Sequence, residues 1–161
     1  HKEVPAKGQI AIFNRSHYED IIAVRVKKIF PDPVWKRRYK HVLDFESMLA
    51  EEGTVIIKLF LNISKEEQKK RLESRLQDPD KLWKFCMDDL DDRNRWDEFQ
   101  TAYQDLIEKT STPEAPWYII PADRKWYRNL VVARLMVEKL RHLQLSLPTP
   151  NFDPASIIIP D

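Results

Sequence analysis

Asn14 and Arg15 form a polar tip between a short apolar run and a predicted helix. The run, residues 10–13 (IAIF), is apolar throughout, which is typical of a buried parallel strand. In open α/β sheets, ligands bind just beyond the carboxyl ends of the strands. A guanidinium group stays charged and can donate to two oxygens of an anion at once. The dipeptide is therefore a candidate binding site for an anion, with an ordinary turn and a solvated arginine as the alternative.

A second group of candidates lies in the highly charged segment 65–77. Gln68, Arg71 and Arg75 follow one another at helical spacing and would share one face. Two leucines are the only apolar residues on this predicted helix, so it has little to pack against. It is either a solvated surface helix or a mobile element that closes over a charged ligand.

Alternating strands and helices must position these side chains. Two patterns of the capping-box type, Ser16 to Glu19 and Ser64 to Glu67, predict helix starts, and Asp123 is a predicted cap for the last helix. Gly53 is suited to end the second helix. We expect strands over residues 10–13, 54–63 and 117–120 and helices over residues 17–29, 34–51, 65–77, 88–109 and 124–145. This alternation predicts a three-layer α/β domain with a parallel sheet.

Length and composition limit the possible function classes. The 161 residues are 42% hydrophobic and 33% charged, as in one soluble globular domain with a charged surface. The net charge of +1 means that affinity for polyanions must come from local clusters, which also disfavours nucleic acid as a partner. No apolar run is long enough for a membrane span. Cys86 is the only cysteine, so we expect a cytoplasmic protein without an internal disulfide.

Two features of the sequence suggest that it is part of a longer protein. It begins at His1, in a charged segment, and not at a methionine. It also contains only two glycines, which are too few for a glycine-rich phosphate loop of the GxxxxGK[ST] type. We therefore expect the chain to be the C-terminal part of a longer polypeptide.

Four motifs resemble, in order, the C-terminal part of family-2 polyphosphate kinases: FNRSHYED, SKEEQKKRLESRLQDPDKLWKF, DRNRWDEFQTAYQDLIEKTST and APWYIIPADRKWYRNL. The resemblance runs from about residue 8 to residue 150. It implies a three-layer α/β/α P-loop kinase-like domain with a parallel sheet and a helical lid, incomplete without an N-terminal segment. Residues 1–147 would be the C-terminal part of that domain, with the lid at about 64–86, and residues 148–161 an extended tail.

The resemblance also implies an activity. Such kinases transfer a phosphoryl group between inorganic polyphosphate and a nucleoside mono- or diphosphate, with Mg²⁺ as cofactor. Phosphoryl transfer depends mainly on positioning and on electrostatic stabilisation of phosphate oxygens, which arginines supply. The expected catalytic residues are Arg15, at the end of the Walker B strand, and Arg71 and Arg75, in the lid. The expected substrate-binding residues are Asn14, Arg25, Lys28, Trp83 and Asp123.

Asn14 is also the expected Mg²⁺ ligand, although an amide binds this ion more weakly than the aspartate found in relatives. The Walker A segment of the family has no counterpart in these residues. In P-loop kinases of this type its strand lies between those that match residues 10–13 and 54–63. We therefore expect these two strands to lack a mutual partner, and an N-terminal segment of the same protein to complete the sheet. The chain should not fold stably alone.

Several alternatives stay open at this level. An ATP-dependent nucleoside monophosphate kinase would share the fold and the lid, and a non-catalytic polyanion-binding module would share the basic residues. Arg25 and Lys28 could be simple helix C-terminal charges, and Trp83 could anchor the lid instead of stacking on a base. Asp78 is expected to end the lid helix rather than to orient an arginine. The acceptor (NMP or NDP), the nucleotide made or used (ATP or GTP) and a homo-oligomeric state are not determined.

Overall fold

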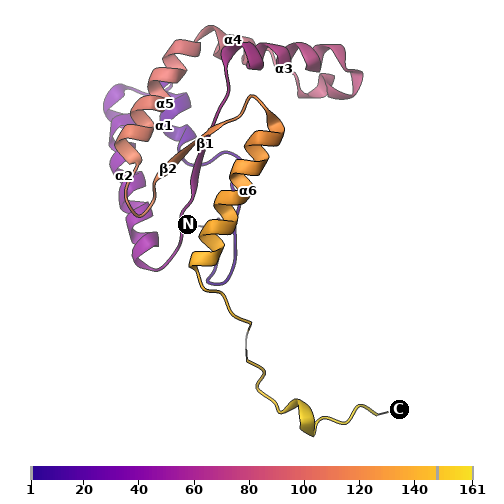
Figure 1. Ribbon diagram of the computed structural model, residues 1–161. Coiled ribbons are helices and arrows are strands. Elements are labelled where there is room, and N and C mark those ends of the chain that lie inside the picture. Colours follow the sequence, from indigo (N-terminus) through magenta and orange to yellow (C-terminus); the bar gives the residue numbers. More distant parts are fainter. Residues whose placement is uncertain (1, 148, 161) are drawn as a thin grey trace.

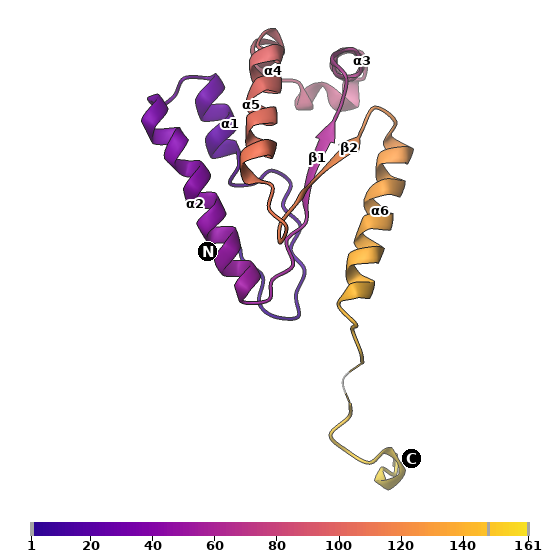
Figure 2. The ribbon, with the colours of Figure 1, turned by 60° about the vertical axis from the view of Figure 1, so that its left-hand side comes forward.

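The computed structural model describes residues 2–147 and 149–160, and its two strands lie between two layers of helices (Figures 1 and 2). Helices α1, α2 and α5 form one layer and α6 the other, which confirms the predicted three-layer α/β arrangement. The elements in chain order are α1 (Glu19–Val26), α2 (Asp32–Glu51), β1 (Lys58–Asn62), α3 (Lys65–Gln77), the 3-10 helix η1 (Pro79–Lys84), α4 (Asp88–Asn94), α5 (Trp96–Thr110), β2 (Trp117–Pro121), α6 (Lys125–His142) and the 3-10 helix η2 (Pro154–Ser156).

The sheet consists of β1 and β2, which pair in parallel. Their register runs from Lys58 opposite Trp117 to Asn62 opposite Pro121. Predicted strand 54–63 is therefore shorter in the structure, because only its second half has a partner strand. The two carboxyl ends lie at the same edge, where the amide of Ala122 donates to the carbonyl of Asn62 at 2.8 Å.

The core lies between α1, α2 and α5. Helical spacing places the apolar residues of each helix toward the other two, and Ile21 and Leu106 are fully buried. Each such side chain contributes roughly 1.5–3 kcal/mol to the free energy of folding. The buried residues of this core are Tyr18, Ile21, Ile22, Val24, Val26, Trp35, Tyr39, Val42, Ala102 and Leu106.

One ion pair is buried at the border of this core and the sheet. Lys58 of β1 and Glu46 of α2 have side chains that are only 4% and 5% exposed, and their Nζ and Oε2 atoms are 2.8 Å apart. Burial acts to raise the pKa of Glu46, but hydrogen bonds from His17, Lys58 and Tyr18 outweigh it and hold that pKa below its usual value. Burial lowers the pKa of Lys58, against the attraction of Glu46. The contacts of Glu46 thus favour its charged form.

The predicted first strand is not present. Residues 10–13 are irregular, and the side chain of Ile12 is 87% exposed. A strand forms only where a neighbour satisfies its backbone donors and acceptors, and residues 10–13 have no such neighbour within 2–147 and 149–160. Among the described residues, segments 10–13 and 54–63 do not pair with each other, as expected without a strand between them; segment 54–63 is paired on one side only, by β2.

The first capping box is also wrong. Helix α1 begins at Glu19, later than predicted, and Ser16 makes no side-chain cap. The amide of Glu19 instead donates to the backbone carbonyl of Ser16 at 3.1 Å, in a tight turn. The carboxylate of Glu19 lies 3.5 Å from Nε of Arg15, so it pairs with the neighbouring cation and not with the helix end.

The long predicted helix 88–109 is interrupted. Arg95 leaves helical geometry between α4 and α5, and its guanidinium donates to the carbonyl of Val26 at the end of α1, at 3.0 Å. The break thus fixes α5 against α1.

Helix α6 packs less tightly than its pattern predicted, since Leu130 and Val137 of its apolar face stay exposed. The tail beyond it is extended apart from η2, and the predicted domain boundary at Pro148 lies outside the described residues. The tail's isoleucines, residues 157–159, are exposed and do not pack on the domain. Within residues 2–147 and 149–160, no helix combines the length and apolar character needed to cross a bilayer.

Candidate functional site

The carboxyl edge of the sheet brings together the root of α3 and the loop after β2. Ser64 caps α3, its hydroxyl accepting from the amide of Glu67 at 3.1 Å, as predicted. The reciprocal half of the capping box is absent, because the amide of Ser64 donates instead to Oδ1 of Asp123 at 2.7 Å. This backbone hydrogen bond is the main reason that the pKa of Asp123 is lowered. Asp123 therefore joins the ends of both strands.

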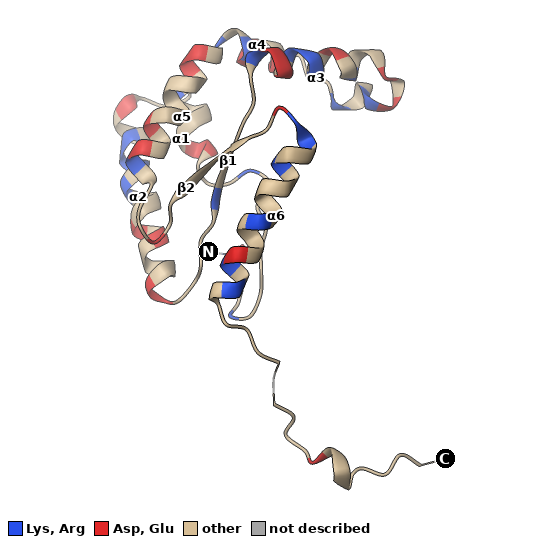
Figure 3. Ribbon diagram, viewed as in Figure 1, with Lys and Arg blue, Asp and Glu red and all other residues tan. Residues whose placement is uncertain are grey.

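The predicted cap of the last helix by Asp123 is accordingly wrong. Helix α6 is preceded by Arg124 and has no side-chain cap, since the carboxylate of Asp123 is turned toward Ser64. Basic residues gather at this helix start, as Figure 3 shows. Arg124 and Lys125 are exposed there, directly after Asp123. Neither cation is among the predicted site residues, although both directly follow Asp123 in the sequence.

Arg71 extends from α3 to the same edge. Its Nε donates to Glu67 at 2.8 Å, and its Nη2 donates to the backbone carbonyls of Ala122 at 2.7 Å and Asp123 at 3.3 Å. Two predicted site residues, Arg71 and Asp123, are thus in direct contact. The Glu67 partner was visible in the sequence as an i, i+4 pair, but the contact across 51 positions with Ala122 was not.

The remaining lid residues lie further along the chain. Nη1 of Arg75 is 3.1 Å from Oδ2 of Asp89, a partner that no sequence pattern predicted. Asp78 ends α3 as expected and then caps η1, its side chain accepting from the amide of Asp80. Trp83 is 78% exposed, with Nζ of Lys84 5.0 Å from the ring centre. The indole Nε1 donates to the carbonyl of Asp80 at 3.0 Å, so the ring is attached to η1 while most of its surface stays in solvent.

Asn14 and Arg15 are exposed in the turn before α1. The side chain of Arg15 is 81% exposed, and its backbone φ is +77°. Arg15 and Glu19 both act electrostatically on Tyr103, whose pKa is raised mainly by burial and whose ring lies 4.9 Å from that of Phe60 in β1. Among the described residues, Arg15 shares no hydrogen-bond or ion-pair partner with Arg71 or Arg75, since it pairs with Glu19 and they pair with Glu67 and Asp89. The two parts of the predicted site are separate here.

Arg25 and Lys28 have other partners. Nη1 of Arg25 is 2.6 Å from Oδ2 of Asp105, and its guanidinium lies over Trp35 at 5.2 Å from the ring centre, so it joins α1 to α2 and α5. Lys28 has a φ of +53° just after α1, where its amide and that of Ile29 close the helix end on carbonyls one turn back. Both arrangements support the reading of these cations as helix-end residues.

The described residues contain no preformed cluster of metal-binding side chains. Among them, no three His, Cys, Asp or Glu side chains gather closely enough to hold a metal ion. Mg²⁺ commonly takes its six oxygens from one or two carboxylates, water and substrate phosphates. Asn14 is exposed and offers one neutral amide oxygen, so it fits as a single ligand at most.

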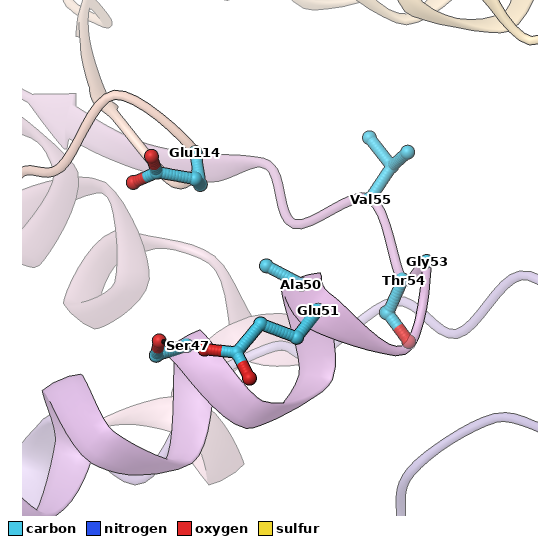
Figure 4. Close-up of a pocket in the computed structure, with 7 residues that line it drawn as sticks. All are labelled: Ser47, Ala50, Glu51, Gly53, Thr54, Val55 and Glu114. Carbon is cyan, nitrogen blue, oxygen red and sulfur yellow. Dashed lines mark hydrogen bonds between the residues drawn. The ribbon is translucent and has the colours of Figure 1, made fainter.

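A hollow at the other end of the strands is a different feature. It lies between the end of α2 and the loops that lead into β1 and β2 (Figure 4), and its charged residues, Glu51 and Glu114, are both acidic. An acidic lining repels phosphate groups. The hollow is therefore not part of the candidate site. Its lining residues are Ser47, Ala50, Glu51, Gly53, Thr54, Val55 and Glu114.

Known proteins are similar in sequence to this chain. Residues 1–147 match the family model of polyphosphate kinase 2 (PPK2). The AMP/ADP-polyphosphate phosphotransferase of Meiothermus ruber is 53% identical over 159 residues, which cover 99% of this chain and 60% of that protein. The ADP-polyphosphate phosphotransferase of Rhodopseudomonas palustris is 36% identical, with 91% of this chain and 55% of that protein covered.

Solved structures share the fold. A crystal structure of polyphosphate kinase 2 from Arthrobacter aurescens TC1 matches with a TM-score of 0.92 at 48% identity, covering 96% of this chain and 55% of that one. A putative polyphosphate kinase 2 from Pseudomonas aeruginosa PA01 gives a TM-score of 0.85 at 31% identity, covering 89% and 31%. This chain thus spans 31% to 60% of the length of these relatives. The chain belongs to the polyphosphate kinase 2 family.

Proposed function

We propose that this protein is a polyphosphate-dependent nucleotide kinase, which transfers a phosphoryl group between inorganic polyphosphate and a nucleoside mono- or diphosphate. One observation carries the proposal beyond family membership: Arg71 of the lid helix reaches the loop after β2 at the carboxyl edge of a parallel sheet. That edge is where α/β domains bind their ligands. The similar proteins of M. ruber and R. palustris are named as polyphosphate phosphotransferases.

The chemistry assigned to these residues is electrostatic. Arg71 and Arg75 bind phosphate oxygens when the lid closes, exchanging contacts with protein oxygens for charge-assisted bonds to the substrate. Arg15 binds phosphates from the turn before α1, where its side chain is 81% exposed and would exchange Glu19 for the substrate. Asp123 positions the lid root at the nucleotide, and the exposed ring of Trp83 offers a surface on which a base can stack. Asn14 lies beside Arg15 and contacts the same phosphates.

Arg25 and Lys28 have a weaker place in this proposal. A basic track through them would require Arg25 to leave Asp105 and Lys28 to act from the capped end of α1. Their contacts in the helical layer support a structural role, so we propose Arg15 as the main cation of this end.

The proposed site needs parts that these residues do not supply. We propose that a glycine-rich phosphate loop and its strand come from a segment outside the 161 residues and pair with residues 10–13. The exposed apolar side chains of Ile10, Ile12 and Phe13 support this, since a neighbouring strand would bury them. Mg²⁺ remains the expected cofactor of the complete protein, with Asn14 contributing at most one ligand. We propose the cytoplasm as its location.

A donor screen tests the function. The full-length protein is incubated with polyphosphate or ATP as donor and with AMP, ADP or GDP as acceptor, and the nucleotides formed are measured by chromatography. Turnover with polyphosphate supports the proposal. Turnover with ATP alone would make the protein an ATP-dependent nucleoside monophosphate kinase. Binding of polyphosphate that falls steeply with salt, without turnover, would make it a polyanion-binding module.

A further inference from the structure

The backbone of Arg15 is held in a conformation that this residue type rarely adopts. Its φ of +77° lies in the left-handed region, where a side chain with a Cβ atom is crowded by its own backbone. Such a conformation costs free energy and persists only where the surroundings impose it. The structure must therefore contain groups that hold this turn in place.

Tyr18, three residues further on, provides the first of these groups. Its ring is buried and packs edge-on against Trp117 of β2, with 4.8 Å between ring centres. Its hydroxyl donates to Oε1 of Glu46 and accepts from Nζ of Lys58 at 3.1 Å. The residue thus attaches the turn to α2 and to both strands.

His17 reaches the same carboxylate. Its ring stacks on that of Tyr18, with 4.6 Å between ring centres, and its Nε2 lies 3.6 Å from Oε1 of Glu46. Two consecutive side chains after the turn therefore converge on one buried acceptor. This arrangement leaves the segment between Arg15 and α1 little freedom to shift.

Lys58 has no donor left for a substrate. Its Nζ donates to Oε2 of Glu46 at 2.8 Å, to the hydroxyl of Tyr18 at 3.1 Å and to the carbonyl of Thr110 at 2.6 Å. An ammonium group has three protons, so these contacts use its full capacity. Although Lys58 is a cation in a family that binds phosphates, its position fits a role inside the protein.

We propose that Glu46, Lys58 and Tyr18 are positioning residues, which fix the turn so that Arg15 is presented to substrate in its left-handed conformation. The proposal rests on the proposed function of Arg15 as a phosphate-binding residue. None of the three touches substrate. They act through Arg15, and their removal should change catalysis by freeing the turn.

Tyr18→Phe in the full-length protein tests this, with Tyr39→Phe as the matched control, since Tyr39 is a buried tyrosine of the same core. The first measurement is amide hydrogen exchange of the peptide that spans residues 13–18, well below the melting temperature. We expect about tenfold faster exchange in Tyr18→Phe, the equivalent of one lost hydrogen bond, and no change in that peptide in Tyr39→Phe. Equal exchange in the two variants would overturn the proposal.

The second measurement separates positioning from stability. We expect Tyr18→Phe to lower kcat about tenfold with the KM for polyphosphate unchanged, and to have no further effect in an Arg15→Ala background. Equal losses in both backgrounds, or unchanged kcat in Tyr18→Phe, would overturn the proposal. If Tyr18→Phe fails to fold, Glu46→Asp, which keeps the charge but shortens its reach, is measured in the same way. Absence of polyphosphate turnover in the unaltered protein would contradict the proposed function, while the exchange measurement still decides whether the anchor exists.

Discussion

Two groups of charged residues in this molecule have the same chemistry and opposite surroundings. Lys58 and Glu46 are almost completely buried, whereas the side chains of Arg71 and Arg75 are 26% and 37% exposed and pair with partners that are also partly exposed. A buried pair has lost its water and depends on its partner. An exposed pair can exchange its partner for another anion at little cost. The comparison teaches that exposure separates structural cations from those available for substrate.

Lys58→Met removes one partner of the buried ion pair and should have the largest effect. Removal of one partner leaves Glu46 charged and buried, so we expect the free energy of unfolding to fall by about 3–5 kcal/mol. Urea denaturation of the full-length protein measures this. The control, Lys36→Met, removes an exposed i, i+4 partner of Asp32 and should cost less than about 0.5 kcal/mol. Similar losses in the two variants would contradict the distinction.

Arg71→Ala tests the exposed end. We expect kcat to fall by about 100-fold or more in the full-length protein, because the loss of a donor to the developing charge typically costs this much. The melting temperature should change little. Lys69→Ala serves as control, since the exposed Lys69 pairs with Glu73 of the same helix and should leave kcat unchanged. Activity of Arg71→Ala within a few-fold of the unaltered protein would remove Arg71 from the site.

Ser64→Ala sharpens the comparison at the root of the lid. The substitution removes the acceptor for the amide of Glu67, so we expect a loss of about 1 kcal/mol in the free energy of unfolding. Denaturant titration measures it. Ser74→Ala, in the exposed middle of the same helix, should be neutral or slightly stabilising, since alanine has the higher helix propensity. A neutral Ser64→Ala would show that the cap does not stabilise α3.

Lys28→Gly should have the smallest effect and the opposite sign. Glycine adopts the left-handed conformation at this helix end without the crowding that lysine suffers, so we expect a gain of about 0.5–1 kcal/mol. Lys28→Ala keeps the Cβ atom and should give no gain, which thermal denaturation can test. A rise in the KM for polyphosphate in both variants would return Lys28 to the binding site.

Local signals predicted helix α3 correctly, although the same capping-box pattern at Ser16 and the Asp123 cap of α6 did not form. Helix α3 occupies the predicted residues 65–77, because the Ser64 cap and the Asp78-Pro79 stop both act within one turn of its ends. The strand predicted over residues 10–13 is absent, because strand formation depends on a neighbouring strand that the composition of these residues does not specify.

Within the candidate site, too, contacts close in sequence were predictable and long-range contacts were not. Glu67 could be assigned to Arg71 from spacing alone, but the link from Asp123 to Ser64 crosses 59 positions and follows only from the parallel register of the strands. The sequence does carry one indication of the buried ion pair: Lys58 is the one charged residue within the apolar run 54–61. A lone charge in a buried strand requires a buried partner.

The bond between Asp123 and Ser64 has a mechanical consequence. It fastens the first residue of the lid to the loop that follows the other strand, so the base of the lid is fixed from two sides. Any movement of α3 must therefore pivot beyond Ser64. The largest displacement is then expected at the other end of the helix, next to η1. The amide of Ser64 and the carboxylate of Asp123 are joined by one hydrogen bond, so a displacement of the start of α3 should be felt by the loop after β2, and the reverse.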